Sequence, residues 1–303
     1  MSSYNKAILY TILVMFIWGS SFTVTKVVVA DLPPFYFAFL RHATASVVLL
    51  LMLWLRRKKP APAGKLPVGT LLWMGLTGVT LYYLFLNLSM RYTSAATGAL
   101  LQGFIPVVIV VMAAVFLKEA MTRKKIAGAI ISVLGVFIVG FLQTSSPGEK
   151  DPLFGNLLVI GCIMAWSVYT ILSKKVARFD ATLVTAWITV SGTVFLIPAV
   201  VAEAVYHPLV MPSLQNWLAI LYLGVFASAL CYVLYNQSLQ YLSAAQVGTF
   251  LNLDPVIGAI IAILFLHEKV GWLQVVGCGL VLTGIWLSSS RGGARQDAPT
   301  PLP

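Results

Sequence analysis

The sequence predicts an all-α membrane protein of ten transmembrane helices, arranged as two inverted five-helix repeats. Of its 303 residues, 59% are hydrophobic and 10% are charged, whereas about a quarter of the residues of a soluble domain are charged. Apolar runs of about 20 residues, long enough to cross a bilayer as a helix, recur along the whole chain. The landmarks of the first half return in the same order in the second half. The expected surroundings are therefore a lipid bilayer.

The ten spans are predicted at 6–28, 33–55, 68–90, 94–117, 124–142, 153–173, 182–205, 214–239, 243–266 and 271–289. A transmembrane β-barrel is not favoured, because runs such as Val107–Leu117 do not alternate apolar and polar residues. The longest connectors are 56–67, 143–152 and the tail after Ser290. They leave no room for a soluble catalytic domain, so any function must be built between helices.

The first four spans carry polar, aromatic or proline landmarks, which are in chain order Trp18, Arg41, Tyr82 with Tyr83, and Gln102 with Pro106. The fifth span, 124–142, is apolar, and Gly128 and Gly135 lie on one of its faces. Small residues of this kind allow close helix contact in membranes. The polar segment Gln143–Pro152 then marks the middle of the chain.

An internal repeat relates the two halves. Pro255 follows Pro106 by 149 positions, and the same offset relates Asn236 to Asn87 and Glu268 to Glu119. Each half contains five spans, and an odd number places the halves in the membrane in opposite senses. The predicted units are residues 6–142 and 153–289, followed by a disordered cytoplasmic tail at 290–303. Inverted repeats are a transporter architecture, with the substrate site near midplane between the halves.

The distribution of positive charge explains the formal net charge of +11. If the N-terminus is cytoplasmic, four lysines and arginines lie in connectors on the outer side of the membrane: Lys26, Arg91, Lys150 and Lys269. Arg41 lies within a span, and the remaining basic residues fall on the inner side. This is the positive-inside pattern, which predicts cytoplasmic termini in a cell (inner) membrane and argues against nucleic-acid binding.

The chain resembles the EamA family of the drug/metabolite transporter superfamily. The resemblance rests on Trp18–Phe22, on Pro34 followed by Arg41, and on the two segments that end in Leu-Lys-Glu and Leu-His-Glu. It covers Lys6 to about Ser289 and implies ten helices and export or exchange of small metabolites such as amino acids. Small multidrug members of the superfamily couple transport to protons through a glutamate in their first helix. Residues 8–29 contain no acid, which puts that coupling route in doubt.

The candidate cavity residues combine aromatic walls with a few polar groups, as ligand pockets do: Trp18, Arg41, Tyr82, Tyr83, Gln102, Trp166, Tyr169, Tyr232, Asn252 and Asp254. Asp254 is the acid deep within a span, and such carboxylates face a cavity or pair with a cation. It is expected to pair with Arg41 or freed backbone groups, to bind a substrate amine, or to carry a proton. Arg41 either snorkels to the interface or binds a substrate carboxylate.

Pro106 and Pro255 are candidate hinges. Proline lacks an N–H and favours a kink, and in lipid the freed carbonyl must be satisfied by protein or water. The kinks either shape packing or line the pathway and bend during transport. Helices 1, 3, 4, 6, 8 and 9 are expected around the cavity, with helices 5 and 10 outside.

These observations predict a secondary transporter that exports or exchanges a small metabolite by alternating access, with an amino acid as the best candidate. A nucleotide-sugar or sugar-phosphate exchanger is the alternative, although such anions need several buried cations. A passive channel is less favoured. An enzyme is not expected, and neither a cofactor nor a metal site is predicted, since Cys162, Cys231 and Cys278 lack metal or disulfide spacing. The expected partners are the substrate, lipid and, as an open alternative, a proton; the protein is a monomer or homodimer.

Overall fold

A computed structural model gives the fold, and it describes residues 3–55, 64–116, 122–141, 150–242, 247, 250–251, 253–267 and 270–289. The described chain is almost entirely helical. Among the sequence predictions, those on Asn252, Glu119, Glu268 and the tail 290–303 lie outside the described residues.

The first half contains five helical segments in the described residues. Its elements are α1 (Ser3–Asp31), α2 (Pro34–Leu55), α3 (Val68–Gly75), the π-helical segment η1 (Leu76–Leu81), α4 (Tyr82–Ser89), α5 (Ala95–Gln102), α6 (Ile105–Phe116) and α7 (Arg123–Phe141). Elements α3, η1 and α4 form one span, because each continues directly into the next. Elements α5 and α6 together form the following span.

The second half repeats this order. Its elements are α8 (Pro152–Lys175), α9 (Ala181–Tyr206), α10 (Leu214–Tyr222), the π-helical segment η2 (Leu223–Leu230), α11 (Cys231–Tyr241), α13 (Leu253–Leu266) and α14 (Trp272–Ser289). Within the described residues, seven helices are long and apolar enough to cross a membrane, and three shorter apolar helices accompany them. The prediction of an all-α membrane protein built from two repeats is confirmed.

Two details differ from uninterrupted α-helical spans. The spans predicted at 68–90 and 214–239 each contain a π-helical segment, at Leu76–Leu81 and Leu223–Leu230. The span predicted at 94–117 is interrupted at Gly103–Phe104, directly before Pro106, where Gly103 N–H donates to Leu100 O at 3.1 Å. The interruption is the break that the missing N–H of proline favours.

Short polar side chains set several helix starts. Ser94, Asp151, Asp180 and Ser213 each accept a hydrogen bond from a backbone N–H three residues later, as N-cap residues do. These caps fix where α5, α8, α9 and α10 begin. The sequence therefore encodes these boundaries locally.

Each half contains one lysine that donates hydrogen bonds to two backbone carbonyls near the end of another helix. Lys26 Nζ donates to Met90 O and Thr93 O, each at 2.7 Å. Lys174 Nζ donates to Leu239 O and Leu242 O at 2.8 and 2.7 Å. Both acceptors in the second half lie 149 positions after those in the first. The internal repeat is thus a repeat of contacts as well as of sequence.

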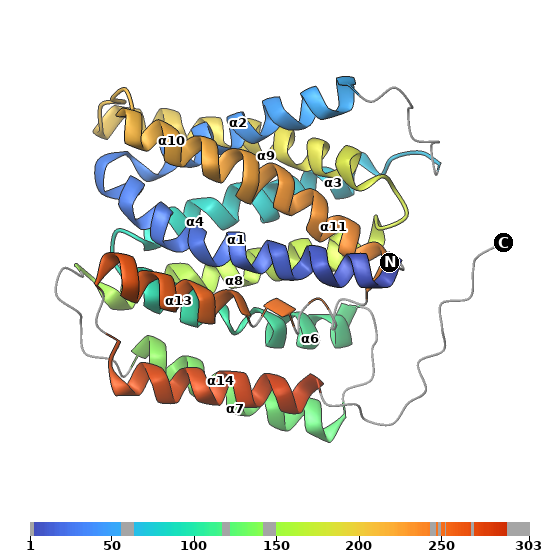
Figure 1. The fold of residues 1–303 in the computed structure, drawn as a ribbon, viewed down its shortest axis with the longest axis vertical. Coiled ribbons are helices and arrows are strands. Elements are labelled where there is room, and N and C mark those ends of the chain that lie inside the picture. The colour runs from blue at the N-terminus through green and yellow to red at the C-terminus, as the bar shows by residue number, and fades with distance from the viewer. Residues whose placement is uncertain are drawn as a thin grey trace.

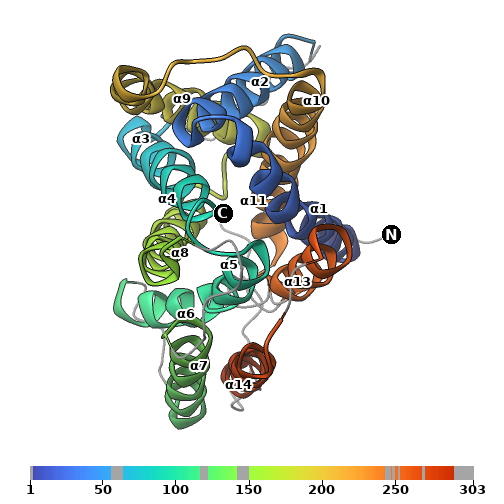
Figure 2. The same cartoon turned by 90° about the vertical axis from the view of Figure 1, so that its left-hand side faces the viewer.

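The helices run roughly side by side, and α7 and α14 form a pair at one edge of the molecule (Figure 1). Viewed along the helices, α1, α4, α5, α8 and α13 surround the middle (Figure 2). Glycine permits the close approach within the edge pair, because a Cβ at Gly277 would lie 2.8 Å from Gly135 O. The expectation that the fifth and tenth helices lie outside agrees with this arrangement.

Large apolar side chains are exposed on the outer faces of many helices, including Trp54 (79%), Trp73 (61%), Phe116 (63%) and Trp272 (73%). A soluble monomer rarely exposes apolar patches of this extent. In a bilayer these faces contact lipid tails. The polar groups described next lie instead in the interior.

Candidate functional site

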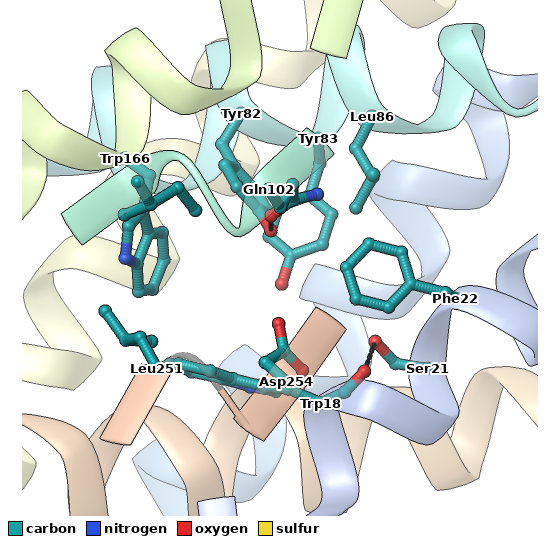
Figure 3. A pocket seen from close by; sticks show the side chains of 11 residues that line it. Trp18, Ser21, Phe22, Tyr82, Tyr83, Leu86, Gln102, Trp166, Leu251 and Asp254 are labelled. Atoms are coloured by element: carbon teal, nitrogen blue, oxygen red, sulfur yellow. Dashed lines mark hydrogen bonds between the residues drawn. The ribbon is translucent and has the colours of Figure 1, made fainter. Parts of the chain in front are cut away.

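A small pocket lies in the middle of the molecule, between elements of both halves (Figure 3). Its walls come from α1, α4, α5, α6, α8 and α13, with the side chains Trp18, Ser21, Phe22, Tyr82, Tyr83, Leu86, Gln102, Ile105, Trp166, Leu251 and Asp254. The free space between them is about 20 Å³, which is room for one water molecule. The pocket is therefore closed around its polar groups in this structure.

Aromatic rings form most of the wall. Trp18 and Trp166 meet edge to face with ring centroids 5.1 Å apart, and Tyr82 lies 5.1 Å from Trp166. Tyr83 contacts Tyr82 at 4.8 Å. Such contacts add to the free energy of burial. They also hold the rings in fixed orientations around the pocket.

Three polar atoms in the wall have no hydrogen-bond partner although they are buried: Gln102 Nε2, Trp166 Nε1 and Asp254 Oδ1. Gln102, Trp166 and Asp254 are 3%, 3% and 7% exposed. The other end of the Gln102 amide is occupied, because Tyr82 donates to Gln102 Oε1 at 2.9 Å. Buried polar groups are normally hydrogen-bonded. Two donors and one acceptor are thus available to a bound molecule.

Asp254 lies across the pocket from the tyrosines, and its carboxylate points toward the side from which Tyr82 and Tyr83 come (Figure 3). The other walls nearby are Trp18 and Leu251. A carboxylate in such an apolar site is costly to leave ionised without a partner. It can therefore bind a cation or exchange a proton.

Arg41 lies behind the pocket wall and not on its surface. It is 1% exposed; Nε donates to Ser228 Oγ at 2.8 Å and Nη2 to Tyr83 OH at 3.1 Å. Its guanidinium carbon also lies 4.4 Å from the centre of the Tyr83 ring, a cation–π distance. The snorkelling alternative is wrong, because the side chain points inward and its polar atoms contact α4 and η2.

Arg41 and Asp254 do not pair with each other. Nη1 of Arg41 and Oδ1 of Asp254 are both without a hydrogen-bond partner. Of the alternatives for Asp254, pairing with Arg41 is therefore not observed in this structure. Tyr83, which contacts Arg41 and lines the pocket, stands between the cation and the pocket.

Apart from Arg41, the described cavity residues predicted from the sequence separate into two groups. Trp18, Tyr82, Tyr83, Gln102, Trp166 and Asp254 line the pocket. Tyr169 and Tyr232 belong to an adjoining aromatic cluster, with Tyr169 4.8 Å from Trp166 and Tyr232 5.5 Å from Trp166 between ring centroids. Whether any of them contacts a substrate stays a prediction.

The two predicted hinges lie close together. Pro106 is in the first turn of α6, directly after the break. A Cβ at Gly103 would lie 3.3 Å from Cγ of Pro255. The break in the first half therefore packs against the proline of the second half. Their role as hinges remains a prediction.

Several wall residues are absent from the sequence prediction: Ser21, Phe22, Leu86, Ile105 and Leu251. Helical spacing could have found four of them. Ser21 and Phe22 follow Trp18 by three and four positions, Leu86 follows Tyr82 by four, and Leu251 precedes Asp254 by three. Residues three and four apart share one helix face. Ile105 follows Gln102 across the helix break, where this rule does not apply.

Within the described part of the chain, His, Cys, Asp and Glu side chains form no group of three that could hold a metal ion. The three cysteines are free thiols, with Cys162 and Cys231 buried. The chemistry available in the pocket is therefore that of hydrogen bonds, one carboxylate and aromatic surfaces.

Comparison with known proteins gives matches over nearly the whole chain. The profile of the EamA-like transporter family matches residues 5–141 and again 153–290. A protein of Archaeoglobus fulgidus named "Uncharacterized transporter" is 30% identical over 95% of this chain and 98% of its own. The "Probable terminal-alkyne amino-acid exporter" of Streptantibioticus cattleyicolor is 29% identical over 98% of both chains. A solved structure, "Crystal structure of protein", has the same fold, with a TM-score of 0.69, 19% identity and coverage of 94% of this chain and 98% of its own.

Proposed function

Because the chain belongs to the EamA-like transporter family, we propose that it is a secondary transporter that exports or exchanges a small metabolite. An amino acid is the best candidate for that metabolite, and alternating access around the central pocket is the mechanism. The observation that carries the proposal is the set of unpartnered buried atoms in an aromatic pocket, Gln102 Nε2, Trp166 Nε1 and Asp254 Oδ1.

The chemistry of these atoms matches a small zwitterion. Gln102 and Trp166 each offer an N–H donor, and a substrate carboxylate would accept hydrogen bonds from both. Asp254 offers an acceptor, to which a substrate ammonium would donate a charge-assisted hydrogen bond. The aromatic walls would surround the apolar part of the molecule. The name of the exporter relative, which refers to an amino acid, supports the same substrate class.

Transport through this pocket requires a change of shape. About 20 Å³ of free space cannot hold an amino acid, so the walls must separate to admit one. Alternating access supplies this movement, as one repeat moves against the other around a midplane site. The proposed bending points are Pro106, which follows the helix break, and Pro255, which packs against Gly103 in that break.

The proposed orientation follows from the charges and the repeat. The two halves enter a cell (inner) membrane in opposite senses, with both termini cytoplasmic. Lys26 then lies at the outer side and its counterpart Lys174 at the inner side, while each makes the same pair of contacts within its own half. A proton remains a candidate coupling ion, with Asp254 as the group that would carry it.

Counterflow in proteoliposomes tests the proposal. Vesicles loaded with an unlabelled amino acid should accumulate the labelled form, and uptake should saturate with concentration. Folded protein that moves none of an amino-acid panel would refute the amino-acid assignment, and non-saturable flux would favour a channel.

The anionic alternative is tested by adding a nucleotide sugar and a sugar phosphate to the panel. We expect no uptake of either, because none of the pocket-lining residues is a lysine or arginine.

Trp166→Phe tests in the same counterflow assay whether the Trp166 N–H contacts the substrate. The variant keeps a ring in the wall but removes the unpartnered N–H. The apparent KM should therefore rise at least about tenfold, because a hydrogen bond to a charged carboxylate contributes about 1.5–3 kcal/mol. Trp73→Phe is the matched control, because it makes the same substitution at a tryptophan that is 61% exposed on the outer face and does not line the pocket. Equal effects of both substitutions would contradict a direct role of the Trp166 N–H.

A further inference from the structure

The two π-helical segments occupy equivalent places in the repeat. Segment η1 follows Gly75 and segment η2 begins at Leu223, beside Gly224, which lies 149 positions after Gly75. The π-helix is rare and is found frequently at functional sites. Its recurrence at the same point in both halves indicates that the irregular turn is a property of the repeat.

Each π-helical segment accepts a hydrogen bond from an aromatic side chain of the opposite half. Trp18 Nε1 in the first half donates to Ala227 O in η2 at 2.8 Å. Tyr232 OH in the second half donates to Gly78 O in η1 at 2.6 Å. The two acceptors, Gly78 and Ala227, are again 149 positions apart. The two hydrogen bonds therefore form a crossed pair: each half donates from one aromatic side chain to the equivalent carbonyl of the other half.

Glycine places each π-helical segment directly on the backbone of the other half. A Cβ at Gly75 would lie 2.9 Å from Ile188 O of α9. A Cβ at Gly224 would lie 2.9 Å from Arg41 O of α2. The side chains nearest to the missing Cβ atoms are small and also belong to the other half: Ser191 at Gly75 and Thr44 at Gly224. Each segment is therefore packed closely against the other half at its glycine.

The segments are connected to the pocket wall by sequence. Tyr82 and Tyr83 follow η1 immediately, and both line the pocket. Trp18 lines the pocket as well, whereas Tyr232 stands behind Trp18 and Trp166, with ring centroids 5.9 and 5.5 Å away. A change in the helix at η1 would therefore move the two tyrosines relative to Asp254.

We propose that Trp18 and Tyr232 are positioning residues that fasten η2 and η1 in the closed state, and that the pocket opens when one crossed hydrogen bond breaks. The inference rests on the proposed function in one respect: the opened pocket is taken to admit a transported substrate. It identifies a bending point in the third and eighth spans, in addition to the candidate hinges Pro106 and Pro255 in the fourth and ninth.

Hydrogen–deuterium exchange on the full-length protein in lipid nanodiscs tests the proposal without any substrate. Tyr232→Phe keeps the ring but removes the hydroxyl, so backbone amides of Leu76–Leu81 should exchange about fivefold faster. Tyr235→Phe is the matched control: Tyr235 is equally buried, stacks near the same tryptophans and donates to no carbonyl of η1. It should leave exchange at η1 unchanged.

Unchanged exchange at η1 in Tyr232→Phe would overturn the proposal, and so would equal acceleration in Tyr235→Phe, which would indicate general loosening of the core. Trp18→Phe tests the other bond, since it should accelerate exchange at Leu223–Leu230 and spare Leu76–Leu81. The exchange result is independent of the transport assay. Absence of amino-acid transport would refute the substrate assignment and leave this inference standing.

Discussion

At the scale of single residues, the important feature is a buried acid without a partner. Asp254 has an unpartnered oxygen in a wall whose other side chains are aromatic, apolar, amide or hydroxyl. Ile105 is its counterpart at the repeat offset, so the repeated scaffold does not need a carboxylate there. Intramembrane ionisable residues of this kind are functional candidates. The asymmetry between the halves is where substrate recognition is expected.

Asp254→Asn removes the charge and keeps the shape of the side chain. Under the proposed amine contact, the apparent KM for an amino acid in counterflow should rise at least about tenfold, because hydrogen bonds to charged groups contribute about 1.5–3 kcal/mol. If Asp254 also carries a coupling proton, the pH dependence of uptake should disappear in the variant. An unchanged KM and an unchanged pH profile together would remove Asp254 from both roles. Gln102→Leu is the variant with which Asp254→Asn is compared, because it removes a hydrogen-bond donor from the pocket wall but no charge.

At the scale of elements, the lysine contacts show how the repeat stabilises its helix ends. Lys174→Met should lower the free energy of unfolding by about 1–3 kcal/mol, because one cation donates to two carbonyls at the end of α11. Thermal denaturation in detergent measures the effect. Lys175→Met is the control, since Lys175 is exposed at the same helix end. Equal losses in both variants would contradict a specific role for the two hydrogen bonds.

The pair α7 and α14 gives a second prediction at this scale. Gly277→Ala should lower stability by about 1–3 kcal/mol, because its Cβ would meet Gly135 O and Val139. The KM for substrate should stay unchanged, since neither helix contributes a pocket-lining residue. Gly279→Ala is the control on the same helix, because no heavy atom lies within 4 Å of its added Cβ. A large KM change in Gly277→Ala would show that the edge pair influences the site.

At the scale of the whole molecule, the proposed opposite insertion of the two repeats makes a prediction about accessibility. In a background with Cys162, Cys231 and Cys278 replaced by alanine, Lys150→Cys should react with an impermeant maleimide on intact cells. Lys175→Cys should react only after the membrane is permeabilised. Both positions are exposed, so reactivity reports their side of the membrane. Labelling of both from outside would contradict the proposed orientation.

The sequence predicts the architecture well because membrane insertion depends on local properties. Span length and composition reflect the thickness and apolarity of the bilayer, and the order of landmarks at an offset of 149 identifies the repeat. Helix starts such as that at Ser94 are also local, since the cap and the amide it accepts from are three residues apart. The π-helical turns were not predicted, although Gly75 and Gly224 at the repeat offset were visible in the chain.

By itself, the sequence determined that this protein is helical, lies in a membrane and consists of two related halves, because hydrophobic periodicity and short-range hydrogen bonds act along the chain. Only the tertiary structure decided which polar groups meet. It brings Gln102, Trp166 and Asp254 to one pocket and places Arg41 behind Tyr83. The physical reason is that these contacts depend on how helices far apart in sequence rotate and pack, which no single span specifies.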